Sequence, residues 1–316
     1  MPVPRVLAAV PPASGAVVMG TGIVSIDFTI DGRETLSRVL LALAALVWVG
    51  LVLLVGARVL GDRPRARREA ASPAALTGIA GTAVLGARVA LLGWTHVAEA
   101  LLVVAVCVWL ALVPRVFAAW VVPTVGVSFV LTVATESLAV LAAVLAVQER
   151  LAWLAVAALA ALALGLVAYV FVLARFDLRQ LLAGRGDHWV AGGALAIATL
   201  ACGRVAQAAH AVHLLRPLAG GLDVASLALW AAAVAWLPAL LVCEIVSPRL
   251  DYDARRWSTV FPFGMYAACS FVAGDVAAVG GIVDFARVWI WLALAVWLAA
   301  TVGLVRRGLR IYREVA

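Results

Sequence analysis

Long apolar runs separated by short polar segments dominate this sequence. A membrane-spanning helix needs about 20 apolar residues, because each residue rises 1.5 Å and the hydrocarbon core is about 30 Å thick. Ten runs satisfy this requirement, and the third is the weakest because it is rich in small residues. The predicted spans are 13–30, 39–60, 74–93, 97–117, 121–147, 151–174, 189–212, 224–246, 259–279 and 286–305. We predict an all-α polytopic membrane protein with one transmembrane domain over residues 1–316.

The composition agrees with this pattern. The chain is 66% hydrophobic and 13% charged, whereas soluble domains usually contain about 25% charged residues. So few charges cannot cover a water-facing surface, so most side chains must face lipid or other helices. The composition therefore excludes a soluble enzyme or a separate soluble domain.

The arginines divide unevenly between the two sides of the predicted membrane. All 24 basic residues are arginine; with ten spans, 17 fall on the side of both termini, 5 on the other side and 2 within spans. The positive-inside rule then predicts a multi-pass plasma-membrane protein with both termini in the cytoplasm. A pI near 10 would suggest nucleic acid in a soluble protein, but here the arginines indicate topology, and we expect no nucleic-acid partner.

Glycine distinguishes the odd-numbered spans from the even-numbered ones. The odd spans contain 13 glycines and the even spans contain 4. Lipid contact has no need of glycine, whereas close helix approach or an open lumen does. We therefore predict five helical hairpins, with the odd helices in an inner, pore-lining ring and the even helices outside it.

Small and hydroxyl residues recur at helical spacing along the odd spans. Such stripes place their members on one helix face, and tight packing without a hole is the alternative interpretation. The candidate pore-lining residues are Gly20, Thr21, Gly22, Ser25, Gly78, Thr82, Gly86, Ser128, Thr132, Thr135, Thr199, Gly203 and Gly264.

The candidate charged residues inside odd spans are Arg88, Glu136, Arg204 and Asp275. A charge within the membrane is a candidate functional group, because its burial is unfavourable. The arginines are candidates for direct anion contact, but we favour structural pairing of Arg88 or Arg204 with Glu136 or Asp275. The two acids are candidates for proton coupling, with Glu136 first.

The ninth span contains Phe261, Pro262 and Phe263 in succession. Proline removes a backbone donor and clashes one turn back, so it kinks or loosens the helix. A bulky ring beside such a kink is suited to a hydrophobic constriction, which blocks ions by dewetting. An ordinary packed aromatic is the alternative interpretation.

Four segments together resemble a known family. They read MGTGIVS at 19–25, TESLAVL at 135–141, WVAGGALAI at 189–197 and WSTVFPFGMY at 257–266. The chain resembles the tellurite-resistance and C4-dicarboxylate transporter family of the voltage-dependent anion channel superfamily. Its relatives include plant guard-cell slow anion channels and yeast malate and sulfite exporters.

The resemblance implies ten helices in five hairpins around a central pore, assembled as a homotrimer. It also implies that an aromatic side chain on the ninth helix occludes the pore, with Phe261 the first candidate and Phe263 the second. Glu136 stands where relatives look more often to carry Gln. An acid there either repels anions or couples their transport to protons.

Transport of a small inorganic anion or dicarboxylate is therefore the expected function, by a gated channel or by a proton-coupled carrier that uses Glu136. An integral-membrane enzyme is a remote alternative, because the sequence has no nucleophile–base cluster or phosphate loop. A passive membrane scaffold is a third. We expect no enzymatic activity, cofactor or metal. The thirteen candidate pore-lining residues are small or carry hydroxyls, and they do not specify which anion passes.

Overall fold

The computed structural model describes residues 10–182, 186–248 and 252–315, and most of them are helical. Within these ranges, ten helices are long and apolar enough to cross a membrane. The prediction of an all-α polytopic membrane protein is therefore confirmed. The ten spans are Pro12–Ile30, Glu34–Gly61, Pro73–Ala90, Thr95–Ala118, Gly126–Glu149, Ala152–Leu173, Trp189–Ala211, His213–Val246, Ala254–Val276 and Gly280–Arg310.

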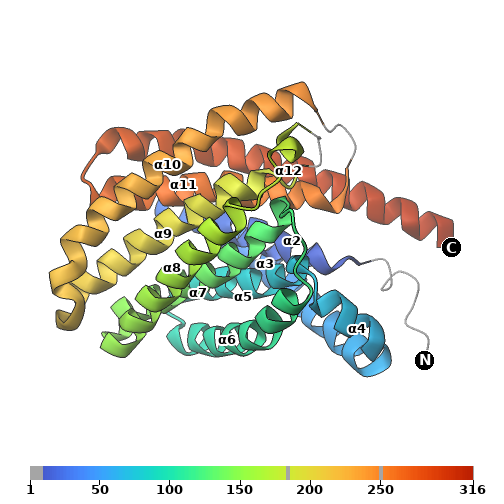
Figure 1. Cartoon of the computed structure of the whole chain (residues 1–316), viewed down its shortest axis with the longest axis horizontal. Coiled ribbons are helices and arrows are strands. Elements are labelled where there is room, and N and C mark those ends of the chain that lie inside the picture. The colour runs from blue at the N-terminus through green and yellow to red at the C-terminus, as the bar shows by residue number, and fades with distance from the viewer. Residues whose placement is uncertain (1–9, 183–185, 249–251, 316) are drawn as a thin grey trace.

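Each span contains one long α-helix, labelled in Figure 1. The odd spans contain α2 (Gly15–Ile30), α5 (Thr77–Ala90), α7 (Val130–Glu149), α9 (Trp189–Ala211) and α11 (Trp257–Val276). The even spans contain α3 (Glu34–Gly61), α6 (Thr95–Ala118), α8 (Ala152–Leu173), α10 (Ala219–Val246) and α12 (Gly280–Val315). A short basic helix, α4 (Arg63–Ala70), connects the second span to the third.

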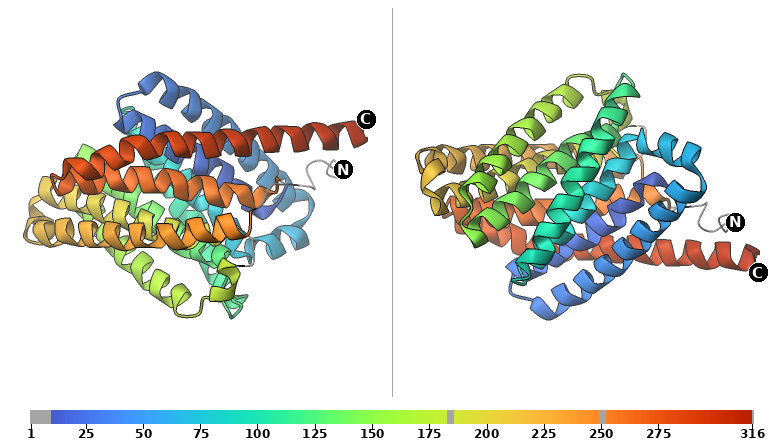
Figure 2. Two further views of the ribbon diagram at one scale, coloured as in Figure 1. Left: turned by 90° about the horizontal axis from the view of Figure 1, so that it is seen from above. Right: turned by 90° about the horizontal axis from the view of Figure 1, so that it is seen from below.

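Two span boundaries differ from the sequence prediction for identifiable reasons. The fifth span is expected to start at residue 121, but Thr124 pairs with Phe176, in the segment that follows α8. The Thr124 amide donates to the Arg175 carbonyl at 2.9 Å, so this segment has partners outside a helix. The tenth span was expected to end at 305, but α12 continues to Val315 and projects past the other helices (Figures 1 and 2).

Burial separates the spans into two sets. Within an apolar stretch of 18 residues in each span, 72–94% of the residues are buried in the odd spans and 17–28% in the even spans. Each odd helix contacts the even helix that follows it, and the odd helices contact one another in the order α2, α5, α7, α9, α11 and back to α2. The outer faces of the even helices therefore supply most of the exposed apolar surface, as lipid contact requires.

Indole N–H groups connect the even helices to the odd ones. Trp48 of α3 donates to the Thr82 hydroxyl of α5 at 2.8 Å, and Trp297 of α12 donates to Thr21 of α2 at 2.9 Å. Trp109 of α6 likewise donates to the Thr135 hydroxyl of α7, and Trp230 of α10 donates to the Ser270 hydroxyl of α11. In all four cases the tryptophan reaches the next odd helix in this contact order, not the odd helix that precedes its own helix in the chain. These bonds satisfy polar groups that the membrane interior would otherwise leave unpaired.

Candidate functional site

The middle of α11 combines a proline with two phenylalanines. Pro262 lies inside the helix, where it cannot donate a hydrogen bond to the carbonyl one turn earlier. Its ring faces Gly193 of α9, at which an added Cβ would lie 2.7 Å from the Pro262 Cγ. The absence of a side chain at Gly193 therefore makes room for the interrupted turn of α11.

Phe263 of α11 packs against two tryptophans. Its ring centroid lies 4.8 Å from that of Trp189 on α9 and 5.4 Å from that of Trp289 on α12, with which it stacks. The Trp289 indole also donates to the Phe263 carbonyl at 3.0 Å. Phe263 is thus fixed by packing between the start of α9 and α12.

Phe261 lies on the opposite side of the same helix. Two residues on an α-helix are about 200° apart, because one turn contains 3.6 residues. Phe261 is only 2% exposed, and among the described residues its ring is in no aromatic pair. Its neighbours Val260 and Pro262 face Gly20 of α2 and Gly193 of α9, so helix geometry directs Phe261 between these two odd helices.

Gly264 lies one turn beyond Phe261 on a similar face and touches α2. An added Cβ at Gly264 would lie 2.5 Å from Ile23 and 3.3 Å from a carboxylate oxygen of Asp27. Asp27 is 0% exposed, and neither of its carboxylate oxygens has a hydrogen-bond partner among the described residues. A buried acid without a partner therefore lies beside the face of α11 that carries Phe261.

Asp27 was missed by the sequence reasoning, although it falls within the first predicted span. The signal was available, because any ionisable residue inside an apolar run is a candidate functional group. Asp27 lies only four residues before Asp31, in the sequence SIDFTIDG, so it resembles part of the polar end of a helix. Only the packing of α2 against α11 shows that its side chain is enclosed.

Glu136 is the second buried acid without a described partner. It is 0% exposed, and neither carboxylate oxygen accepts a hydrogen bond from the residues that the structure describes. A Cβ at Gly165 of α8 would collide with the Glu136 side chain. Glu136 therefore extends from α7 toward its outer neighbour α8, where Gly165 leaves room for it.

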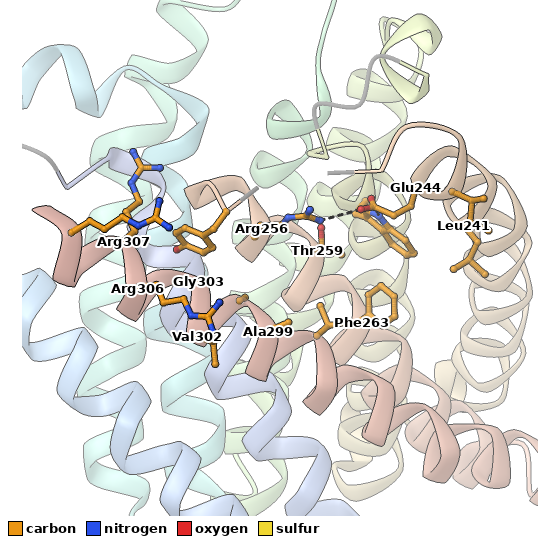
Figure 3. A pocket seen from close by; sticks show the side chains of 16 residues that line it. Leu241, Glu244, Arg256, Thr259, Phe263, Ala299, Val302, Gly303, Arg306 and Arg307 are labelled. Atoms are coloured by element: carbon orange, nitrogen blue, oxygen red, sulfur yellow. Dashed lines mark hydrogen bonds and ion pairs between the residues drawn. The ribbon is translucent and has the colours of Figure 1, made fainter. Parts of the chain in front are cut away.

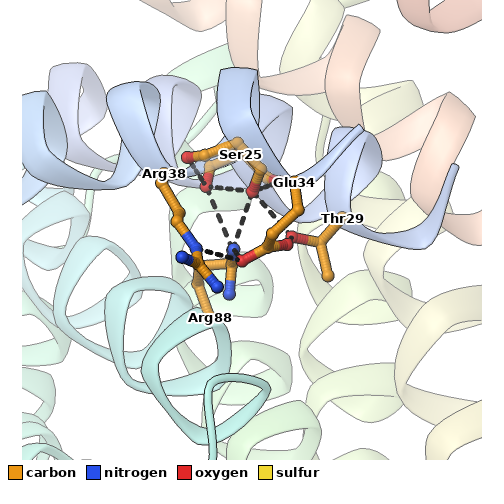
Figure 4. Close-up of polar contacts among 6 residues, drawn as sticks. Ser25, Thr29, Glu34, Arg38 and Arg88 are labelled. Carbon is orange, nitrogen blue, oxygen red and sulfur yellow. Dashed lines mark hydrogen bonds and ion pairs between the residues drawn. The ribbon is translucent and has the colours of Figure 1, made fainter. Parts of the chain in front are cut away.

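Arg88 is 0% exposed and lies in a polar cluster at one end of α2, α3 and α5 (Figure 4). It donates to Glu34 at 2.8 Å, to the Ser37 hydroxyl at 2.9 Å and to the Ser25 hydroxyl at 3.2 Å. Thr29 donates to the other Glu34 oxygen at 2.8 Å. The cluster joins three helices through charge-assisted hydrogen bonds.

This cluster corrects the expected pairing of Arg88. The expected partners were Glu136 and Asp275, but the carboxylate bound to Arg88 is Glu34. Glu34 lies in the first turn of α3 and precedes the predicted start of that span at 39. Its position before the apolar run predicts a residue outside the membrane, so the sequence alone does not indicate Glu34 as the partner of Arg88.

Arg204 has a different environment from Arg88. It donates to Gln207 on the same helix at 2.9 Å, and the nearby Asp275 acts on it electrostatically without an ion pair in the described structure. Asp275 is exposed at the end of α11. Neither residue is among the fully buried charged groups.

Comparison with known proteins bears directly on this arrangement. A family model described as voltage-dependent anion channel matches residues 9–305. The chain belongs to the voltage-dependent anion channel family. Membership in this family implies transport of anions across a membrane.

Two relatives are described as uncharacterized membrane proteins, from the CDC 1551 / Oshkosh and H37Rv strains of Mycobacterium tuberculosis. Each is 35% identical to this chain over 135 residues, which cover 37% of this chain and 66% of the relative. The chain thus spans 66% of the length of these curated relatives.

Most of the Ser and Thr hydroxyls that we expected to line an anion pathway form hydrogen bonds to neighbouring helices. Thr21, Thr82 and Thr135 accept the indole bonds from α12, α3 and α6. Ser25 bonds to the cluster around the buried arginine. Thr132 differs, because its hydroxyl is buried without a described hydrogen-bond partner. The remaining two bond to backbone atoms: Ser128 to the Val125 amide and Thr199 to the Leu195 carbonyl.

The glycines expected along the pathway lie mainly at close helix contacts. An added Cβ at Gly86 would lie 2.7 Å from Leu141, and Gly264 meets Ile23 as described above. At Gly78, in contrast, no described atom lies within 4 Å of an added Cβ. The glycines at which a Cβ would meet another helix are Gly20, Gly22, Gly86, Gly203 and Gly264. Five of these six positions thus fit the packing alternative, and Gly78 is open.

Proposed function

We propose that this protein conducts small anions along a path between α2, α5, α7, α9 and α11, and that Phe261 closes the path. The observation that carries the proposal is the opposite orientation of the two phenylalanines on α11. Phe263 is packed against Trp189 and Trp289, whereas Phe261 is buried without an aromatic neighbour among the described residues, and helix geometry directs it to the opposite face. Family membership supplies the transported class, anions.

The local structure around Phe261 supports a movable constriction. Pro262, the residue after Phe261, removes one backbone hydrogen bond of α11. Gly264, one turn after Phe261, has no side chain. A ring at such a position can change rotamer with little disturbance of the helix. Hydrophobic constrictions of this kind stop ions by excluding water and open with small side-chain movements.

A proton-coupled carrier for C4-dicarboxylates or oxyanions is a second candidate function. It is favoured by the two fully buried acids, Asp27 and Glu136, whose carboxylates have no described hydrogen-bond partner. An ionised carboxylate beside an anion pathway repels the anion, and protonation removes that repulsion. Asp27 is the better placed of the two, because it lies beside Gly264, whereas Glu136 extends toward α8.

Anion flux into proteoliposomes tests the proposal. Purified protein is compared with protein-free vesicles for chloride, nitrate, malate and tellurite, with and without a pH gradient. Channel conduction predicts uptake down the anion gradient that does not need the pH gradient. Uptake of malate only when a pH gradient is imposed would favour the carrier, and absence of uptake of every anion would contradict both candidates.

Two neutral variants separate the roles of the acids. Asp27→Asn and Glu136→Gln keep side-chain size and remove the titrating group. In a carrier, the variant of the coupling acid abolishes the effect of the pH gradient, while in a channel flux persists in both variants. A trimer, which the resemblance implies, stays a prediction that the mass of the purified complex tests.

A further inference from the structure

A cavity of about 880 Å³ opens on the outer side of α11, between α10 and α12 (Figure 3). Phe263 and Thr259 of α11 line it, and Trp189 of α9 also contributes. It lies at the end of the bundle where α12 extends past the other helices. The cavity is separate from the Phe261 face, because it lies on the side of α11 that faces the outer helices.

Four arginines and one glutamate line this cavity: Arg256, Arg306, Arg307, Arg310 and Glu244. Both carboxylate oxygens of Glu244 have partners: one pairs with Arg256 at 3.1 Å and the other accepts the Trp189 indole N–H at 3.1 Å.

The three arginines of α12 differ from Arg256, which pairs with Glu244. Arg306, Arg307 and Arg310 form no ion pair within the part of the chain that the structure describes, and all three are exposed. Four positive charges against one negative charge leave a net charge of three at the cavity. The cavity is therefore strongly electropositive.

The remaining walls are apolar and face outward. Leu241, Ile245 and Val302 are 39%, 76% and 47% exposed, on spans whose outer faces contact lipid. On α12, Ala299 lies one turn before Gly303, whose missing side chain makes room for the Tyr252 ring. The cavity thus has apolar sides along the helices and a basic rim at their ends.

We propose that this cavity binds one anionic phospholipid. The phosphate of the headgroup lies among Arg306, Arg307 and Arg310, and an acyl chain lies along Leu241 and Ile245. Basic pockets between transmembrane helices at the membrane boundary suit anionic headgroups. A soluble anion would satisfy the arginines but would leave the apolar sides unoccupied. This binding does not depend on the proposed conduction path.

Native mass spectrometry of the delipidated full-length protein tests the proposal, with phosphatidylglycerol and phosphatidylcholine as probes. The variant Arg306→Gln/Arg307→Gln removes two charges from the rim. The matched control, Arg67→Gln/Arg68→Gln, removes two exposed arginines from α4, which lies at the same end of the molecule. All four positions are exposed, so both double variants are expected to fold.

The wild type should retain phosphatidylglycerol in preference to phosphatidylcholine. Each arginine near an anionic lipid contributes about fivefold in affinity, so the rim variant should bind phosphatidylglycerol about 25-fold more weakly. The α4 control should match the wild type. Equal retention of both lipids, or an equal loss in the control, would overturn the proposal.

A second variant separates a lipid from other occupants. Ala299→Phe narrows the apolar side at an exposed position and should reduce phosphatidylglycerol retention while the rim charge is unchanged. Inorganic phosphate should not displace the lipid from the wild type. Full displacement by phosphate would assign the cavity to a soluble anion, and loss of a higher oligomer in the rim variant with unchanged lipid retention would assign it to a second copy of the chain.

Discussion

The two faces of α11 differ in how firmly they are held. On the outer face, Phe263 stacks on Trp289, the Tyr266 hydroxyl donates to the Ala233 carbonyl at 3.0 Å, and Ser270 accepts the Trp230 indole at 2.8 Å. On the inner face, Phe261 is in no aromatic pair within the described structure. One helix therefore combines an anchored side with a side free of such directional contacts.

This difference separates two roles that the sequence could not distinguish. Both phenylalanines flank Pro262, and either fits a hydrophobic constriction by composition. The ring of Phe263 is held by Trp189 of α9 and Trp289 of α12, so its movement would break both ring contacts. We infer that Phe263 stabilises the fold and that Phe261 controls passage.

The largest stability effect is expected from Phe263→Ala. Removing a buried phenylalanine ring typically destabilises a protein by about 3–5 kcal/mol, and Phe263 is only 9% exposed. Thermal unfolding in detergent should show a clear fall in midpoint, while anion flux per folded protein stays close to that of the wild type. A large rise in flux with unchanged stability would reverse the assignment of the two rings.

A smaller effect is expected where the inner face touches α2. Gly264→Val places a side chain where Ile23 already lies at 2.5 Å from an added Cβ, and overpacking costs about 1–3 kcal/mol. Gly78→Ala is the matched control, because no described atom lies within 4 Å of its added Cβ. Thermal unfolding should show a loss in the first variant and none in the second; equal losses would contradict the packing described for α2 and α11.

Trp230→Phe tests a single outer anchor. It removes the indole donor to Ser270 and keeps a ring, so the expected destabilisation is about 1 kcal/mol. Flux should not change, because the bond lies on the outer face. Trp153→Phe provides the control, since that tryptophan is 65% exposed; an equal effect there would show that the measured loss is not specific to the bond.

The smallest effect on stability is expected from Asp27→Asn, which keeps size and removes only the charge. Anion flux in the wild type should fall as pH rises, because the ionised carboxylate beside the pathway repels anions. The variant stays neutral, so its flux should not depend on pH. Flux measured across a pH series decides this, and the same slope in both proteins would remove Asp27 from the pathway.

The sequence predicted the helices better than it predicted their side-chain contacts. Run length and apolarity indicated ten spans, because the thickness of the membrane sets the length of a spanning helix. The glycine excess marked the five spans that the structure buries. It did not distinguish a lumen from close packing, because both favour small residues; at Gly86 and Gly264 the structure shows packing.

Contacts between spans far apart in the chain were not predictable from local pattern. Trp297 and Thr21 are separated by 276 positions, yet their bond joins α12 to α2. The hydroxyl of Thr21 therefore looked available for a lumen when only its own helix was considered. Glu34 was similarly missed as the partner of Arg88, because it lies before the apolar part of its span.

In the proposed mechanism Phe261, and not Phe263, closes the pathway. Chloride and nitrate flux into proteoliposomes should be measured for wild type, Phe261→Ala and Phe263→Ala at equal amounts of folded protein. Phe261→Ala should gain at least about tenfold in flux, which corresponds to a barrier lower by about 1.4 kcal/mol, and Phe263→Ala should gain little. Unchanged flux in Phe261→Ala, or a larger gain in Phe263→Ala, would contradict it.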